Sequence, residues 1–132
     1  MTIYEIDGRR FSTLDEFYLE MDRVMQLASW GHGLDSFNDI LRGGFGTPEE
    51  GFTILWKNHE ISRERLAYPE TVRQLKLRLT RCHPNSRESV ARHLKEAEDG
   101  RGDTAFDWLV DIIRRHGPGG EEEEDRVVLV LE

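Results

Sequence analysis

The sequence lacks the features of a secreted or membrane-bound protein. Cys82 is its single cysteine, so no disulfide can form within the chain. No segment approaches the roughly 20 consecutive apolar residues that a membrane helix requires. Residues 1–7 carry neither a basic flank nor an apolar stretch of signal-peptide length. We therefore expect a cytoplasmic protein that has no membrane partner.

The sequence also lacks the common motifs of catalysis and cofactor binding. It contains no Gly-x-Ser-x-Gly, His-Glu-x-x-His or phosphate-binding loop, and its histidines other than His32 are scattered without metal-ligand spacing. We therefore expect no enzyme, no catalytic residue, no metal and no cofactor. One alternative stays open, because His32 with Asp35 and Asp39 could bind a divalent metal in a hydrolase. The remaining histidines are expected at the surface: His59, His83, His93 and His116.

Basic residues are scarce and unevenly placed. The chain has 18 Lys and Arg against 26 Asp and Glu, a net charge of −8. Such an acidic chain is disfavoured as a direct binder of nucleic acid and suits a basic partner. Between Ser62 and Arg101, however, ten Lys and Arg face six Asp and Glu, so this stretch has a net charge of +4 and the rest −12. The middle of the chain differs in character from its two ends.

Hydrophobic periodicity predicts a single α/β domain over residues 1–132. Compact runs of β-branched and aromatic residues predict three strands, at residues 2–6, 52–56 and 126–131. Such continuous apolar runs suit parallel strands that are covered on both faces. Apolar residues at three- and four-residue steps predict helices between them, with Thr13 and Asp103 as N-caps: residues 14–27, 34–41 and 104–115.

The basic middle segment, about residues 68–102, adds two helical candidates. One runs from about Glu70 to Cys82 and the other from Asn85 to about Ala97. Leu75, Leu77 and Leu79 also alternate as in a strand, so the first candidate has a second interpretation. We expect both helices to pack on the domain, because their apolar side chains need cover. The acidic run at 121–125 is interpreted as a solvated loop.

The most specific pattern lies between Trp30 and Gly43. It reads aromatic-Gly-x-x-Leu-Asp-x-Phe-x-Asp-x-Leu-x-Gly, and it resembles the binding loop and short helix of the barstar family without a gap. The predicted strands resemble that family too. The resemblance implies a small three-stranded parallel sheet packed with helices, with residues 68–102 as an insertion. It also implies inhibition of a secreted bacterial ribonuclease. The implied partner-binding residues are Trp30, Gly31, His32, Gly33, Asp35, Asn38, Asp39, Gly43 and Phe45.

The residue types in this pattern fit that function. A ribonuclease holds RNA phosphates with cationic side chains, so a rigid array of carboxylates can block it. Asp35 and Asp39 are four residues apart and would share one helical face, while Phe37 and Leu41 turn toward the core. We expect both carboxylates to be exposed to solvent. The partner is then a basic ribonuclease of extracellular type or a nuclease toxin.

The sequence departs from the family at four positions. The family usually has a tyrosine pair where this chain has Ser29 and Trp30, an asparagine at Gly33 and a tryptophan at Asn38. Each difference removes a contact that the family implies. A protein-interaction module of the same fold, without nuclease inhibition, therefore remains the alternative.

Overall fold

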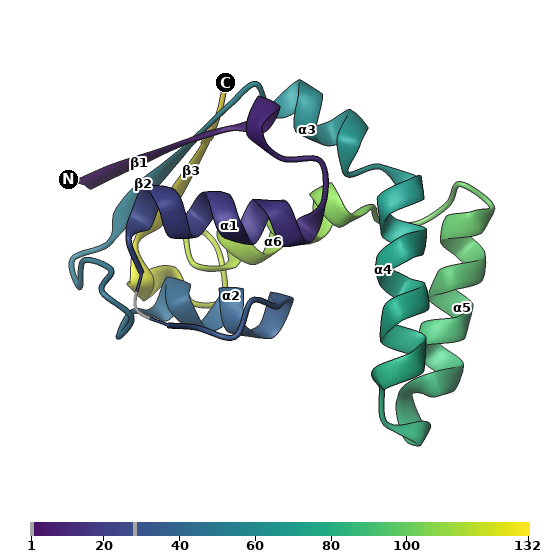
Figure 1. Cartoon of the computed structure of the whole chain (residues 1–132). Helices are drawn as coiled ribbons and strands as arrows, with labels where there is room; N and C mark the ends of the chain where they lie inside the picture. Colours follow the sequence, from purple (N-terminus) through teal and green to yellow (C-terminus); the bar gives the residue numbers. More distant parts are fainter. Residues whose placement is uncertain (1, 28) are drawn as a thin grey trace.

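The computed structural model describes residues 2–27 and 29–132. Three strands form one parallel sheet in the order β1 (Thr2–Asp7), β2 (Phe52–Lys57) and β3 (Val127–Leu131) (Figure 1). The strands start level with one another, because Thr2 of β1 pairs with Phe52 of β2, and Phe52 pairs with Val127 of β3. The sheet confirms the predicted three-stranded parallel α/β fold. None of the helices in these described residues is long and apolar enough to cross a membrane.

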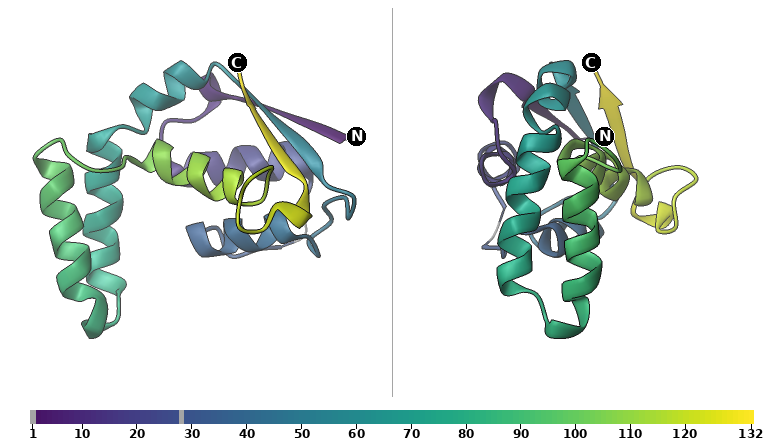
Figure 2. Two further views of the ribbon diagram at one scale, coloured as in Figure 1. Left: turned by 180° about the vertical axis from the view of Figure 1, so that it is seen from behind. Right: turned by 90° about the vertical axis from the view of Figure 1, so that its right-hand side faces the viewer.

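Helices cover one face of this sheet. The helices α1 (Leu14–Met25), α2 (Leu34–Arg42) and α6 (Ala105–Arg115) all lie on that side (Figures 1 and 2). The burial of β2 alternates accordingly, since Ile54 and Trp56 are fully buried and the residues between and after them are half-buried. The helix-bearing face therefore holds the core.

The opposite face of the sheet is open, and the expectation that both faces are covered is wrong. Ile3 on β1 and Val130 on β3 are 62% and 40% exposed. The same face carries an ion pair between Glu5 and Lys57, at 2.9 Å. The apolar runs do not distinguish the two cases, because β-branched residues suit a strand in a half-covered sheet as well as one in a fully covered sheet.

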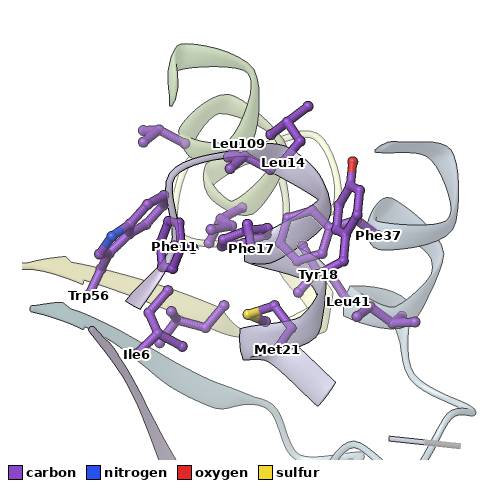
Figure 3. Packing of buried hydrophobic residues seen from close by; sticks show 14 of the residues in the cluster. Ile6, Phe11, Leu14, Phe17, Tyr18, Met21, Phe37, Leu41, Trp56 and Leu109 are labelled. Carbon is purple, nitrogen blue, oxygen red and sulfur yellow. The ribbon is translucent and has the colours of Figure 1, made fainter. Parts of the chain in front are cut away.

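Aromatic rings dominate the core beneath the helices (Figure 3). Phe17 of α1 stacks on Trp56 of β2, with 5.6 Å between ring centroids. The same ring meets Phe37 of α2 in a T-shaped contact at 5.3 Å. Such pairs add about 0.5–1.5 kcal/mol to the stabilisation by burial. Because Phe37 and Leu41 are buried as predicted, α2 is fixed to the core by one face and presents the other to solvent.

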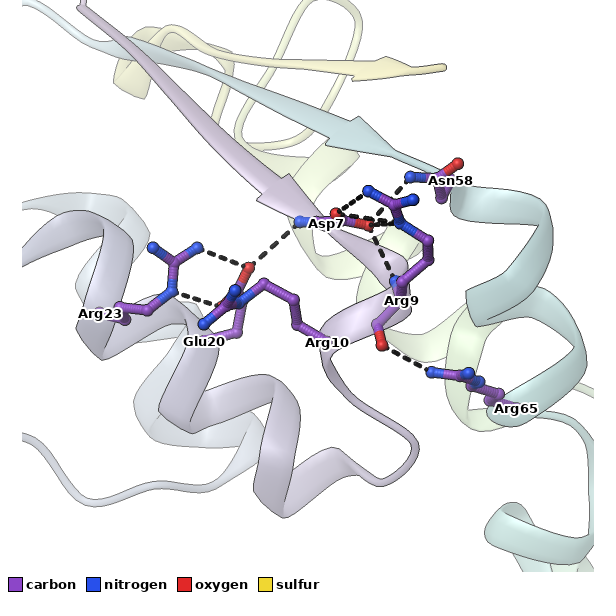
Figure 4. Close-up of polar contacts among 7 residues, drawn as sticks. All are labelled: Asp7, Arg9, Arg10, Glu20, Arg23, Asn58 and Arg65. Atoms are coloured by element: carbon purple, nitrogen blue, oxygen red, sulfur yellow. Dashed lines mark hydrogen bonds and ion pairs between the residues drawn. The ribbon is translucent and has the colours of Figure 1, made fainter.

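A polar network fixes α1 against the end of β1 (Figure 4). The buried carboxylate of Glu20 accepts hydrogen bonds from the backbone of Asp7 at 3.2 Å and from Arg10 and Arg23 at 3.1 and 2.8 Å. Burial acts to raise the pKa of Glu20, and these hydrogen bonds outweigh it and lower the pKa. Asp7 in turn accepts from Asn58 after β2, at 2.9 Å. The network thus ties the helix that supports the site to two strands.

The N-cap of α1 is confirmed and that of α6 is corrected. Thr13 Oγ1 accepts a hydrogen bond from the backbone N–H of Glu16 at 3.1 Å, as the sequence predicts. For α6 the predicted cap, Asp103, is wrong. Thr104 occupies the cap position and forms a reciprocal capping box with Asp107. Asp103 and Thr104 are neighbouring residues that can both cap a helix. Thr104 is favoured because Asp107, three residues later, bonds back to it.

The helix α3 (His59–Arg65) was not predicted. Its seven residues carry no continuous apolar face, and its buried residue is Ser62, whose Oγ accepts a hydrogen bond from the Trp56 ring at 3.0 Å. Gly8 permits this close approach, because a Cβ there would lie 2.3 Å from Ser62 Oγ. Tertiary contact rather than periodicity defines this helix.

The helices α4 (Tyr68–Arg81) and α5 (Arg87–Glu98) form a hairpin that projects from the domain (Figures 1 and 2). Helices are confirmed over most of the two predicted ranges. Their apolar side chains cover one another in a second cluster around Leu75 and Val90, which Trp108 of α6 joins to the main core. The expectation that both helices pack on the domain is wrong for their distal turns.

The base of the hairpin is firmly attached to the domain. The buried carboxylate of Glu70 accepts a hydrogen bond from the backbone of Leu14 at 2.9 Å. Thr71 Oγ1 accepts one from the backbone of Ala105 at 2.7 Å. These bonds satisfy the first backbone N–H groups of α1 and α6, which have no partner within their own helices. The hairpin therefore begins from a fixed point.

Candidate functional site

The helix α2 presents two carboxylates to solvent. Asp35 and Asp39 are both exposed and lie one turn apart, while Phe37, Ile40 and Leu41 face the core. The exposure of both carboxylates confirms the expectation from the sequence. A helix packed by its apolar face holds such side chains at a fixed spacing, so they can act together on a cationic surface.

Glycines bound this helix at both ends. Gly33 is its N-cap residue and supplies no side-chain hydrogen bond to the first turn. Its extended backbone is open to other residues, since a Cβ there would meet its nearest neighbour at 3.5 Å. Gly43 ends the helix with a φ of 105°, a region that favours glycine. Phe45, just beyond, is half-buried against the core.

The loop before α2 is tied to α1 through Asp22. The ring N–H of Trp30 donates to one carboxylate oxygen of Asp22, and His32 Nε2 lies 2.7 Å from the other. Tyr18 of α1 packs against both rings, with centroids 5.5 Å from Trp30 and 6.1 Å from His32. Neither Asp22 nor Tyr18 was predicted at the site. The single sequence gives no signal for them beyond their places on α1.

Gly31 lies at the centre of this loop and is exposed. A Cβ on Gly31 would come within 2.8 Å of Ser36 Oγ on α2. The glycine therefore allows the loop to lie close against the first turn of the helix.

An arginine connects Asp39 to the acidic loop before β3. Arg42 Nη1 donates to Asp39 at 2.8 Å, and Arg42 Nε donates to Glu122 at 2.7 Å. The Asp39 side chain is still 56% exposed. The hydrogen bond from Arg42 also lowers the pKa of Glu122. The acidic run was expected as a solvated loop, and the structure instead gives Glu122 a partner on α2.

Asn38 faces inward, where it meets a buried histidine. Its Oδ1 lies 2.7 Å from Nε2 of His116, whose Nδ1 lies 2.7 Å from Asp125. His116 is 0% exposed, so the expectation that it is a surface residue is wrong. The spacing gave a usable signal, because His116 follows Ile113 by three residues and continues the buried face of α6. The three side chains join α2, α6 and the acidic loop.

The described residues contain one group whose ligand atoms are close enough to share a metal ion. These are His116, Glu122 and Asp125, within 4.8 Å of one another. Both imidazole nitrogens and the Glu122 carboxylate already have protein partners. The alternative metal site at His32 is not assembled, because that imidazole faces Asp22 of α1.

Comparison with known proteins identifies the family. No curated protein matches the chain. The family described as Barstar (barnase inhibitor) matches residues 1–106, which include the loop, α2 and the hairpin. The match covers well over half of the chain and both exposed carboxylates of α2. The chain therefore belongs to the barstar family of barnase inhibitors.

Proposed function

We propose that this protein inhibits a ribonuclease, as an immunity protein or antitoxin, by placing α2 and the preceding loop in the active site of its partner. One observation carries the proposal. Asp35 and Asp39 are exposed on one face of a helix whose other face packs on the core, within the segment that the family match covers. Both carboxylates remain accessible to a partner, although Asp39 also accepts a hydrogen bond from Arg42.

The chemistry of the two surfaces is complementary. A ribonuclease binds the phosphates of RNA with arginine, lysine and protonated histidine, which make its cleft a concentrated positive field. Asp35 and Asp39 would occupy phosphate positions, with Asp39 deepest by resemblance to the family. The loop before α2 would contact the rim of the nuclease cleft through Trp30, Gly31, His32 and Gly33. At the other end of α2, Gly43 and Phe45 would contact the same rim.

The partner and the setting follow from this chemistry. A basic ribonuclease of extracellular type, or a nuclease toxin, is the proposed partner, and the inhibitor would act in the cytoplasm. No cofactor, metal or direct contact with RNA is required. The chain would act as one domain over residues 1–132, with residues 68–102 as an insertion.

An inhibition assay tests the proposal. Barnase and a panel of barnase-type ribonucleases would be titrated with the protein while RNA hydrolysis is followed. The double substitution Asp35→Asn with Asp39→Asn should abolish inhibition. The control is Glu121→Asn with Glu124→Asn, which makes the same change in charge on exposed residues of the acidic loop. Inhibition of no ribonuclease, or equal inhibition by both double variants, would contradict the proposal.

A second function is favoured by Asn38. The family usually places a tryptophan here, whereas Asn38 in this chain is half-buried and bonded to His116. A nuclease contact at this position is thereby weakened. A protein-interaction module without nuclease inhibition would bind a basic partner through α2 and leave RNA hydrolysis unaffected.

A further inference from the structure

A cleft of about 860 Å³ lies between α2, the α4–α5 hairpin and α6. Leu34 and Asp35 line it from α2, and Arg78 and Val90 line it from the hairpin. Trp108 contributes from α6. Figures 1 and 2 show that the hairpin projects away from the sheet, on the side of the domain where α2 and α6 lie. The cleft thus opens next to the carboxylates proposed to meet the nuclease.

The charged side chains of this cleft have no ion-pair partner among the described residues. Asp35 and Asp111 supply negative charge, and Arg78 and Arg115 supply positive charge. Arg78 lies over the ring of Trp108, 5.4 Å from its centroid. Partial burial raises the pKa of Asp111, and the nearby carboxylates of α6 and its N-terminal flank add to this effect. All four charges are therefore available to a partner.

The mixture of charges and apolar side chains indicates the class of that partner. A nucleic acid would require a mainly basic surface, and the two carboxylates oppose it. Apolar side chains of Leu34, Val90 and Ile112 lie among the charges. An apolar centre within a polar rim is typical of protein–protein interfaces. A protein segment fits the cleft best.

We propose that this cleft receives a surface loop of the ribonuclease that α2 blocks, an inference that rests on the proposed function. Asp35 belongs both to the acidic face of α2 and to the lining of the cleft. A nuclease that reaches Asp35 must therefore lie against the hairpin as well. Its loop would carry an apolar side chain, with a carboxylate for Arg78 or Arg115 and a cation for Asp111.

This arrangement gives the hairpin a role in specificity. A cationic active site is common to ribonucleases that bind RNA phosphates, so α2 alone discriminates weakly between them. Surface loops differ in length and charge between related proteins. The hairpin would accept nucleases whose loop matches the cleft and reject the others by steric and charge conflict.

Two matched pairs of substitutions test the role of the cleft. Arg78→Glu reverses a charge in its lining, and Arg92→Glu makes the same change on α5 outside the lining. Ser86→Trp adds bulk to the lining, and Ser89→Trp adds it to an exposed position outside the lining. Dissociation constants would be measured against a barnase-type ribonuclease that the unmodified protein inhibits. Thermal unfolding would verify that each variant is folded.

Each cleft variant should weaken binding by about tenfold or more relative to its control. If each cleft variant binds as tightly as its control while Asp39→Ala loses binding, the cleft has no role in binding. The proposed function would still stand. If no ribonuclease in the panel is inhibited, both proposals fail. Weakened binding of single-stranded RNA by Arg78→Glu, without any effect on a nuclease, would also overturn the cleft proposal.

Discussion

Arg42 donates a hydrogen bond to Asp39 at 2.8 Å, one turn earlier on the same helix. The carboxylate that the proposed mechanism places deepest in the nuclease is therefore partly neutralised in the free protein. Both side chains are exposed, and Arg42 also binds Glu122. The guanidinium of Arg42 reduces the electrostatic repulsion between Asp35 and Asp39. It also repels a cationic partner that approaches this surface.

Substitution Arg42→Ala should speed association with a barnase-type ribonuclease. Removing the cation takes away the ion-pair partner of Asp39 and leaves Glu122 with His116, at 3.7 Å. The surface becomes more negative, which strengthens steering of a basic partner. We expect a rise of a few-fold at low ionic strength and a change in unfolding free energy of about 1 kcal/mol or less. Stopped-flow kinetics would measure the rate, with Arg101→Ala as control, since Arg101 also forms an exposed ion pair. A slower association would contradict the prediction.

Substitution Gly33→Asn should stabilise α2 and tighten nuclease binding. Gly33 is an extended N-cap residue with room for a side chain, and asparagine can accept a hydrogen bond from the first turn. The gain in unfolding free energy should be a few tenths of a kcal/mol, as for other glycine-to-asparagine N-cap changes. Urea unfolding measures it. The control Gly43→Asn should destabilise, because the φ of Gly43 is 105°. A loss of stability in Gly33→Asn would show that the cap has no room.

Substitution His116→Phe should loosen α2. It leaves Asn38 and Asp125 without the imidazole to which both are bonded. An unpaired polar group costs about 1–3 kcal/mol when fully buried, so these two half-buried groups together should cost about that much. Urea unfolding should show this loss, and amide exchange should rise in α2 more than in β2. The matched substitution His93→Phe, at an exposed position on α5, should have little effect. Unchanged exchange in α2 would exclude a positioning role for His116.

Glu70 should contribute to the loss of stability in acid. Burial acts to raise its pKa, but hydrogen bonds from Arg73, Gln74 and the backbone of Leu14 outweigh this and lower the pKa. A lowered pKa in the folded state means that the contribution is present above the unfolded pKa of 4.5 and lost as pH falls through the folded value. Substitution Glu70→Gln should therefore cost about 1–3 kcal/mol at neutral pH and progressively less in acid.

Urea unfolding of Glu70→Gln and the unmodified protein at about pH 7 and about pH 3.5 would measure this difference. The exposed Glu98→Gln serves as control and should show no such dependence. A gap in stability between Glu70→Gln and the unmodified protein that stays constant with pH would contradict the assignment.

The strands and the core-facing side of α2 could be predicted because short-range patterns determine them. Phe37 and Leu41 follow the helical period of a buried face, and the β-rich runs have few alternatives in a short chain. The helix α3 could not be predicted, because a hydrogen bond from Trp56 to Ser62 and the close approach of Gly8 define it. The prediction that both faces of the sheet are covered was wrong, because the composition of a strand does not determine which helices pack against it.

The candidate site was predictable only on its exposed side. Asp35 and Asp39 could be placed from a four-residue spacing on an amphipathic helix. Their supports lie far away in the sequence, as Asp22 holds Trp30 and Glu122 holds Arg42. Such partners are set by the tertiary fold, so no local pattern in one sequence identifies them.

The affinity of Asp39→Ala for a ribonuclease that the unmodified protein inhibits is the most direct test of the carboxylate mechanism. Binding should weaken by several kcal/mol, a size that we take from the family and not from the geometry of this chain. Asp35→Ala should weaken binding by as much or less, and Glu122→Ala hardly at all. Association of the unmodified protein should slow as salt rises, because steering fades beyond a Debye length of about 10 Å at 0.1 M. If Asp39→Ala binds with unchanged affinity and unchanged salt dependence, the carboxylates of α2 do not block the nuclease.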